Sequence, residues 1–159
     1  FDIRKSEYQD ASAIESGISA RNSDVHSILN GSVTVDGETL EYNRTASDYD
    51  NVRYFNAWLT HNNAYNSNVN SAPADAWECV SALLGRWGAE GPVCEGYARA
   101  FKVLCNEAGI PCVLVDGEAI NSTNRPEAHM WNYVQMEDGK WYAVDVTWND
   151  PTVSGASAA

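Results

Sequence analysis

The sequence predicts an α+β fold, in which helices come first and an antiparallel sheet follows. Apolar residues recur at helical spacing up to about residue 108, and from residue 112 they alternate with the two-residue period of strands. Between the two halves, at residues 91–101, a Gly-Pro loop turns into a helix with a cysteine in its first turn. Helices that precede a run of strands are typical of the α+β class.

The composition indicates one folded domain over residues 1–159. At this length, with 44% hydrophobic residues, the chain can bury a substantial core but is short for two domains. A net charge of −12 argues against nucleic acid or an anionic membrane surface as a partner. No apolar run approaches the length of a membrane span. We therefore expect no nucleic-acid partner and no membrane-spanning segment.

Residues 1–47 are interpreted as a variable helical preface. The apolar spacing favours one amphipathic helix around residues 11–18 and a second, shorter one around residues 25–29, capped near Ser23. A small hairpin is predicted at residues 33–40, turning at Asp36-Gly37. His26 lies among polar neighbours and is expected at the surface.

Two further helices are predicted before the cysteine. The first begins at Ser47, which resembles an N-cap because acidic residues follow it in the first turn, and it ends at residues 61–63. After a polar loop, apolar spacing predicts the second helix over residues 74–84.

The cysteine helix is predicted to begin near Cys94 and to stop at residues 109–111, Gly-Ile-Pro. A helix N-terminus presents unpaired N–H groups and a partial positive charge. Such an environment favours a thiolate and stabilises a developing oxyanion. Taken alone, however, a cysteine here is more often a small buried residue at the start of a core helix, and the residues that follow it in the chain reverse that interpretation.

The other cysteines give no sign of a metal site. Cys79, Cys105 and Cys112 form no CxxC pair, which argues against a zinc knuckle or ribbon, and no cofactor is expected. Cys105 and Cys112 are interpreted as inert buried thiols. A disulfide between Cys79 and Cys112 stays open on the sequence alone.

Three strands are predicted after the cysteine helix, at residues 112–117, 129–136 and 141–148. A polar loop separates the first two strands, and Asp138-Gly139 joins the last two.

Four blocks of sequence, in order along the chain, carry a resemblance to a known family. They are Gly-Pro-Val-Cys-Glu-Gly-Tyr-Ala-Arg-Ala-Phe at 91–101, Ala-Gly-Ile-Pro-Cys at 108–112, His-Met-Trp-Asn-Tyr-Val at 129–134, and Gly-Lys-Trp-Tyr-Ala-Val-Asp-Val-Thr-Trp-Asn-Asp-Pro at 139–151. Together they resemble the transglutaminase-like superfamily, in a bacterial type of domain. The helix that ends Ala-Trp-Leu-Thr-His-Asn-Asn-Ala-Tyr at 57–65 is similar to that family's upstream helix.

The resemblance implies a papain-like catalytic core over residues 48–151, with a triad of Cys94, His129 and Asp145. Residues 152–159 are then a tail that stops earlier than in most family members. The chemistry asks for the same three residue types independently. A thiol attacks an amide carbon as thiolate, an imidazole near neutrality serves as its base, and a carboxylate orients that imidazole.

A purely structural role explains His129 better than it explains Asp145. His129 is also explained as a hydrogen-bonded histidine at a strand end. Asp145 is harder to explain, because Asp is disfavoured inside a strand and this one lies between Val144 and Val146.

The register of the last hairpin tests the triad. A two-residue Asp138-Gly139 turn would pair Asn132 with Asp145 and place His129 on the opposite face. A three-residue loop, 137–139, pairs Met136 with Lys140 and Trp131 with Asp145, so that His129 lies diagonal to Asp145 on one face. We therefore predict the three-residue loop, with Gly139 at positive φ. The catalytic face, against the cysteine helix, is expected to carry Trp131, Tyr133, Ala143 and Thr147, and the other face Val134, Val144, Val146 and Trp148.

The side-chain donor of an oxyanion hole is less well defined. No Gln stands shortly before Cys94, where papain-like enzymes carry one, and Met130 is bulkier than the residue expected after the histidine. The backbone N–H of Cys94 is the better donor. The side-chain candidates for an oxyanion or substrate contact are Tyr65, Asn63, Trp87 and Trp131.

Three functional hypotheses follow. The first is a thiol acyl-transfer enzyme acting on peptide or amide bonds, as a cysteine peptidase, an amidase or a transglutaminase-like cross-linker. The second is a binding or scaffold module of a secreted or cell-surface protein that keeps the triad without useful turnover. The third is an amidase directed at glycopeptides. The expected partner is a peptide or protein, including a cell-wall peptide, and the expected location is extracellular or at the cell surface.

Overall fold

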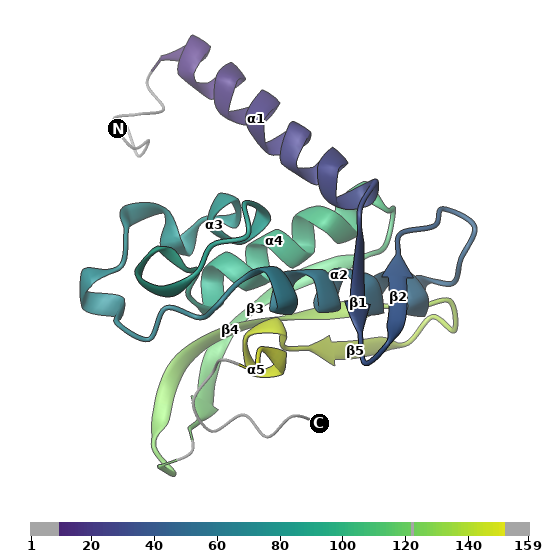
Figure 1. Ribbon diagram of the computed structural model, residues 1–159. Helices are drawn as coiled ribbons and strands as arrows, with labels where there is room; N and C mark the ends of the chain where they lie inside the picture. Colours follow the sequence, from purple (N-terminus) through teal and green to yellow (C-terminus); the bar gives the residue numbers. More distant parts are fainter. Residues whose placement is uncertain (1–9, 122, 152–159) are drawn as a thin grey trace.

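The computed structural model describes residues 10–121 and 123–151 and confirms the α+β class. Helices α2, α3 and α4 lie on one side of a three-stranded antiparallel sheet, β3–β5 (Figure 1). The tail at residues 152–159 lies outside the described residues. The division of the chain at residues 47 and 151 stays a prediction.

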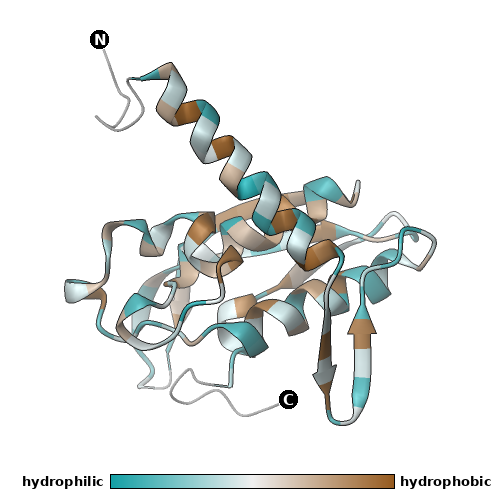
Figure 2. Cartoon of the chain, turned by 45° about the horizontal axis from the view of Figure 1, so that its top comes forward, coloured by the Kyte–Doolittle hydropathy of each residue, from teal (hydrophilic) through white to brown (hydrophobic). Residues whose placement is uncertain are grey.

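Helix α1, Ala11–Leu29, is a single helix, so the prediction of two helices is wrong. Its N-cap is Asp10, whose carboxylate accepts a hydrogen bond from the Ser12 N–H at 2.8 Å. Ser23, predicted as a cap, lies inside the helix because no proline interrupts the backbone bonds there. Only the last turns pack on the body, through buried Val25 and Ile28, while the first turns stand off from it (Figure 2). His26 is exposed, as predicted.

The first hairpin is confirmed. Strands β1, Ser32–Val35, and β2, Glu38–Glu41, pair with Val35 opposite Glu38, so that Asp36-Gly37 forms a two-residue turn. Asp36 and Gly37 have φ values of 50° and 82°, as the commonest tight hairpin turn requires.

Helix α2, Asp48–Asn62, begins where the sequence predicts. The Ser47 hydroxyl accepts a hydrogen bond from the Asp50 N–H at 3.1 Å. A short 3₁₀ turn, Val69–Ser71, lies in the loop that follows.

The helix predicted over residues 74–84 is broken in two. A 3₁₀ turn, Ala74–Trp77, is followed by the short helix α3, Cys79–Leu83, because Glu78 between them is extended, with φ −94° and ψ 153°. One more 3₁₀ turn, Gly88–Glu90, precedes the cysteine loop.

Helix α4, Cys94–Glu107, is the central element of the core. Its buried side packs against α2, α3, β3, β4 and the short helix α5, Val146–Asn149. The side chains of Tyr97, Phe101 and Leu104 are fully buried. Such a helix, covered on most sides, holds its N-terminus in a fixed position relative to the sheet.

The sheet is formed by β3, Cys112–Ile120, β4, Pro126–Gln135, and β5, Trp141–Val144, with β4 in the middle. The predicted register of the last hairpin is confirmed. Tyr133 pairs with Ala143, and the Met136 N–H donates to the Lys140 carbonyl at 3.1 Å. Gly139 has a φ of 75°, so the loop has three residues and ends in the left-handed region.

The end of the last strand differs from the prediction. Strand β5 stops at Val144, and residues 146–149, predicted as strand, form α5 instead. The cause is Asp145, whose Oδ1 accepts a hydrogen bond from the Trp148 N–H at 3.1 Å and caps the new helix. Trp131 therefore has no ladder partner in β5, because the last pair is Asn132 with Val144.

The predicted assignment of the sheet faces is wrong as well. Val134 is fully buried in the core, and Asn132 donates to the Ala98 carbonyl of α4 at 3.0 Å, so these residues face the cysteine helix. Tyr133, predicted to face that helix, is 38% exposed, and Ala143 is exposed too. Yet His129, whose side chain is on the same face of β4 as that of Tyr133, is buried. The ladder between β3 and β4 is regular throughout, so the right-handed twist of the strands turns this face inward near His129.

Candidate functional site

Cys94 is the first residue of α4, and backbone contacts hold the loop before it. The Val93 N–H donates to the Ala76 carbonyl at 3.1 Å, and the Asn66 N–H donates to the Pro92 carbonyl at 3.0 Å. At Gly91, a Cβ atom would lie 2.0 Å from the Ala64 carbonyl oxygen, so only glycine fits this approach. The side chain of Cys94 is partly exposed, so the thiol is both fixed and accessible.

His129 on β4 lies beside Asp145, at the end of β5. Its Nε2 is 2.7 Å from Asp145 Oδ2. Asp145 is held in turn, because its Oδ1 caps α5. Cys94 is the second hydrogen-bond partner of the ring.

The protonation of His129 reflects both partners. Burial, the largest single influence, lowers the pKa of His129, whereas hydrogen bonds to and electrostatic interactions with Asp145 and Cys94 raise it, with a net value of about 9. The structure thus brings the three predicted residues together, with an imidazole that favours the charged form between a carboxylate and a thiol.

Two tryptophans lie against the imidazole ring. The His129 ring is nearly parallel to the indole of Trp131, with centroids 5.8 Å apart, and to that of Trp148, with centroids 5.2 Å apart. Trp131 was among the predicted site residues, but Trp148 was predicted on the opposite face of the sheet. Its position results from α5, and the cue in the sequence was Asp145 as a helix N-cap with Pro151 just beyond the helix.

Helix α5 is fixed to the rest of the fold by two polar contacts. The hydroxyl of Tyr97, in α4, donates to the carboxylate of Asp150, and both residues are fully buried. Burial, and then this bond, raise the pKa of Tyr97. Asn149 donates to the Asn56 side chain of α2 at 3.0 Å. Sequence reasoning missed both contacts, although Asn149 and Asp150 belong to the last block of the family resemblance.

The side-chain candidates for the oxyanion hole differ in whether they lie near Cys94. Tyr65 is near Cys94, since its pKa is raised to about 12, first by burial and then by the charges of Cys94 and Glu127. Asn63 is fully buried, with its amide donating to two backbone carbonyls and accepting from the Arg86 N–H, so it is a structural residue. Trp87 is 58% exposed and precedes a 3₁₀ turn. Tyr65 is therefore the candidate that the structure brings to the cysteine.

All four cysteines are free, so the disulfide between Cys79 and Cys112 that the sequence left open is not formed. Cys105 and Cys112 are buried, as expected, and lie against one another in the core. The hydrogen bond between them, and then burial, raise the pKa of Cys105. The Asn132 amide also lies 3.6 Å from Cys112 Sγ.

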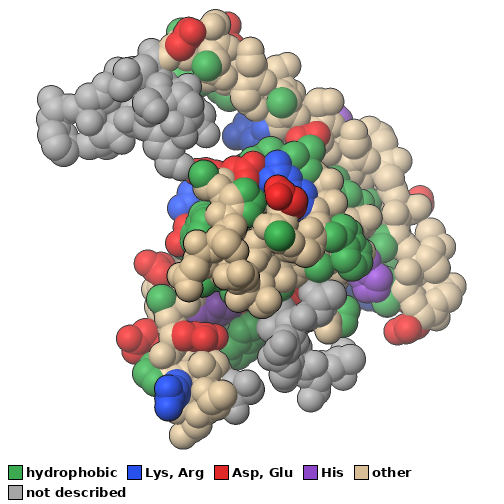
Figure 3. All heavy atoms as spheres, turned by 60° about the vertical axis from the view of Figure 1, so that its left-hand side comes forward, with side chains coloured by type: hydrophobic (Ala, Val, Ile, Leu, Met, Phe, Trp, Pro, Cys, Tyr) green, Lys and Arg blue, Asp and Glu red, His purple; other side chains and the backbone are tan. Residues whose placement is uncertain are grey.

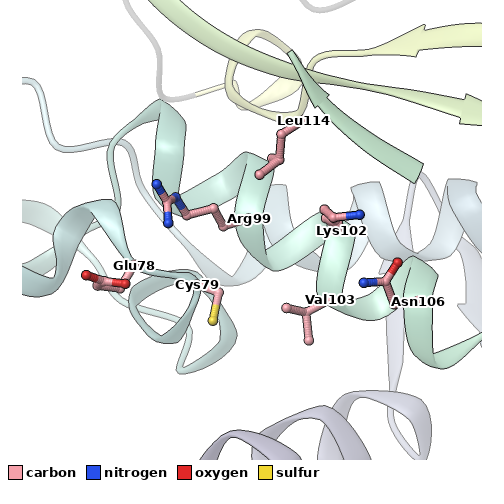
Figure 4. A pocket seen from close by; sticks show the side chains of 7 residues that line it. All are labelled: Glu78, Cys79, Arg99, Lys102, Val103, Asn106 and Leu114. Carbon is pink, nitrogen blue, oxygen red and sulfur yellow. The ribbon is translucent and has the colours of Figure 1, made fainter. Parts of the chain in front are cut away.

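Cys79 lines a separate hollow of about 230 Å³ between α3, α4 and β3 (Figure 4). Its pKa is raised, chiefly by burial. Cys94, His129 and Asp145 do not border this hollow, which is lined by Glu78, Cys79, Arg99, Lys102, Val103, Asn106 and Leu114. Within residues 10–121 and 123–151, no group of three or more His, Cys, Asp or Glu side chains is placed to hold a metal ion.

Comparison with known proteins identifies the family. Residues 39–146 match the family model of the transglutaminase-like superfamily, which covers more than half of the chain, so this chain belongs to that superfamily. It is similar to the kyphoscoliosis peptidase of Mus musculus, with 30% identity over 67% of this chain and 17% of that protein. It is also similar to the kyphoscoliosis peptidase of Homo sapiens, with 36% identity over 38% of this chain and 10% of that protein.

A third relative is a probable serine/threonine-protein kinase of Arabidopsis thaliana, with 36% identity over 39% of this chain and 6% of that protein. The chain thus spans less than a fifth of the length of each of these relatives. In the described part of the chain, the helices are too short or too polar to cross a membrane.

Proposed function

We propose that this domain is a thiol-dependent acyl-transfer enzyme acting on peptide or amide bonds, with Cys94, His129 and Asp145 as its catalytic triad. The observation that carries the proposal is that one imidazole, that of His129, has both Cys94 and Asp145 as partners. Membership of the transglutaminase-like superfamily and the likeness to a named peptidase support the same class of chemistry.

The first half of the reaction is acylation. The Cys94 thiolate attacks the carbonyl carbon of the substrate amide, and the carbonyl oxygen becomes an oxyanion. The backbone N–H of Cys94, unpaired at the start of α4, and the Tyr65 hydroxyl are its proposed donors. The His129 imidazolium gives its proton to the leaving amine, the C–N bond breaks, and a thioester to Cys94 remains.

The second half is deacylation. His129, now neutral, takes a proton from a water molecule or an amine as it attacks the thioester carbonyl. Water gives a carboxylic acid, as in a peptidase or amidase, and an amine gives a new amide, as in a cross-linking transglutaminase. In both cases the thiolate leaves and the ion pair with His129 is restored. Asp145 keeps the ring oriented through both halves.

The flanking tryptophans support this assignment. An indole face attracts a cation, so Trp131 and Trp148 stabilise the charged form of His129. Trp148 is 41% exposed, so its outer side is free to contact a bound substrate. The proposed location is extracellular or at the cell surface, and the proposed substrate a peptide or protein, including a cell-wall peptide.

The proposal is tested by trapping the acyl-enzyme. Wild-type protein, Cys94→Ala and Cys79→Ala are incubated with activated peptide esters and with a panel of peptides, isopeptides and cell-wall fragments, then analysed by intact mass. We expect an acyl adduct on Cys94 in the wild-type protein and in Cys79→Ala, and turnover of at least one substrate class. Adduct formation without any turnover would favour the scaffold module, and the absence of adducts would contradict the enzyme proposal.

A further inference from the structure

Strands β3 and β4 extend beyond the end of β5 as a two-stranded ribbon. They remain paired as far as Ile120 and Pro126, whereas β5 pairs with β4 only as far as Asn132. The ribbon projects beyond α5 at the lower left of Figure 1. Because His129 lies on this ribbon, the residues next to it in the ladder border the proposed site.

Two glutamates of the ribbon lie on opposite faces. Glu127 is two residues before His129 on β4, so the two side chains share a face, about 7 Å apart along the strand. Glu118 pairs with Ala128 and therefore points to the other face. Both glutamates are exposed. They form a matched pair of equal charge, one on the face of His129 and one turned away from it.

A second observation relates Glu127 to the surroundings of Cys94. Tyr65, which comes from the loop after α2, lies within electrostatic range of both Cys94 and Glu127. This agrees with the alternation along β4, which puts the side chain of Glu127 on the face of His129. The hydrogen-bond donor to the Glu127 carboxylate, the side-chain amide of Asn121 at 3.3 Å, carries no charge of its own. In one view of the surface, acidic side chains lie near a histidine, with a basic side chain below them (Figure 3).

We propose that Glu127 is a specificity-determining residue that selects substrates carrying a lysine or arginine side chain close to the scissile amide. This inference rests on the proposed function, since it names the substrate class of the same site. A carboxylate on the face of His129 attracts a cationic group that approaches Cys94 and repels an anionic one. The overall charge of −12 adds attraction for basic peptides at longer range.

The first test measures the local field at Cys94 without requiring turnover. A cationic trimethylammonium-ethyl and an anionic sulfonatoethyl methanethiosulfonate react with the thiolate in the same way, forming a mixed disulfide and releasing methanesulfinate. The rate at Cys94 is followed by peptide mass spectrometry in the wild-type protein, Glu127→Gln and Glu118→Gln. Both variants change the net charge equally, so they differ only in the face that loses its carboxylate.

We expect the ratio of cationic to anionic labelling rates at Cys94 to fall about fivefold in Glu127→Gln and less than about twofold in Glu118→Gln at low ionic strength. An equal fall in both variants, or no fall in Glu127→Gln, would overturn the inference.

The second test uses peptides that differ only in one residue next to the scissile amide, lysine or glutamate. We expect kcat/KM to favour the lysine peptide and Glu127→Lys to reverse the preference, while Glu118→Lys keeps it. Turnover without a charge preference would overturn the inference and leave the proposed function intact. Charge-selective labelling of Cys94 with no peptide turned over would instead contradict the proposed function and support the role of Glu127 in the local field.

Discussion

Two cysteines in this fold begin helices, and only one of them has an imidazole partner. Cys94 is the first residue of α4 and Cys79 is the first residue of α3. Both are partly exposed, and neither helix has a side-chain cap at its N-terminus. The helix-start position and partial exposure of Cys94 are therefore shared by Cys79, which the sequence had placed inside a predicted helix.

What differs is the surroundings that the rest of the chain supplies. Cys94 has His129 beside it, while Cys79 lies near the charged side chains of Arg21, Glu78 and Arg99, and burial raises its pKa. The imidazole reaches Cys94 because β4 packs on α4, and the register of the last hairpin brings Asp145 to the same ring. A helix N-terminus is thus a common setting for a thiol, and the long-range pairing of strands is what distinguishes the proposed nucleophile.

The largest effect on activity is expected from removing the thiol of Cys94, with removal of the Cys79 thiol as the control. Cys94→Ala should reduce turnover of an activated peptide ester by about 10⁴-fold or more, because no other group forms the acyl intermediate. Cys79→Ala should change it less than about twofold, because Cys79 lies outside the group formed by Cys94, His129 and Asp145. Comparable losses in the two variants, measured as kcat/KM with folding checked by circular dichroism, would remove the distinction between the two cysteines.

The second largest loss of activity is expected from removing the carboxylate of Asp145. Asp145→Asn keeps a good N-cap for α5 but presents an amide to His129, so we expect kcat to fall by about 10²- to 10⁴-fold with the helix retained. Asp36→Asn, at a turn position that also tolerates asparagine, is the matched control and should keep full activity. A nearly unchanged kcat in Asp145→Asn would mean that another carboxylate orients the ring.

The interactions of His129 with Asp145 and Cys94 should also make the free energy of unfolding depend on pH. The pKa of His129 is about 9 in the folded protein, above its usual 6.5, so the folded state holds the proton more tightly than the unfolded chain. The resulting stabilisation is complete below about pH 6.5 and is lost as the pH rises through about 9. Between pH 6.5 and 10, the wild-type protein should lose on the order of 2 kcal/mol more free energy of unfolding than His129→Gln, by urea denaturation. Parallel curves would contradict the charged pair.

A smaller effect is expected from the turn glycines. Gly139→Ala and Gly37→Ala each force a side chain into the left-handed region and should cost about 1 kcal/mol of stability. Only the first substitution lies in the hairpin that carries Asp145 to His129. A shift of the His129 NMR titration in Gly139→Ala, with none in Gly37→Ala, would link the hairpin loop to the site; equal behaviour would separate them.

The two hairpins also show where sequence reasoning succeeds. Both contain Asp-Gly, which by itself predicts a two-residue turn, and the first hairpin forms one. The second closes with three residues, and this was predictable only by requiring His129 and Asp145 to share a side of the sheet. Helix α4 and the position of Cys94 at its start were also predictable, because the periodicity of the apolar residues and the Gly-Pro before the helix determine them locally.

The errors arise where tertiary geometry overrides local pattern. Residues 141–148 alternate like a strand, yet Asp145 caps α5 and removes Trp148 from the sheet, bringing it against His129. The faces of β4 were assigned as if the strand were flat, whereas its twist turns both Asn132 and His129 inward. Asp150 was not predicted in any role, because only the packing of α5 shows its bond with Tyr97.

The difference between the two helix-start cysteines is tested most directly by their alkylation. Iodoacetamide labelling of Cys94 and Cys79 is followed by peptide mass spectrometry from pH 5 to 9, in the wild-type protein and in His129→Gln. We expect Cys94 to react at pH 6 at least about tenfold faster than Cys79, and this advantage to disappear in His129→Gln. Equal rates for the two cysteines at pH 6, or an advantage of Cys94 that persists without His129, would contradict the thiol–imidazole pair.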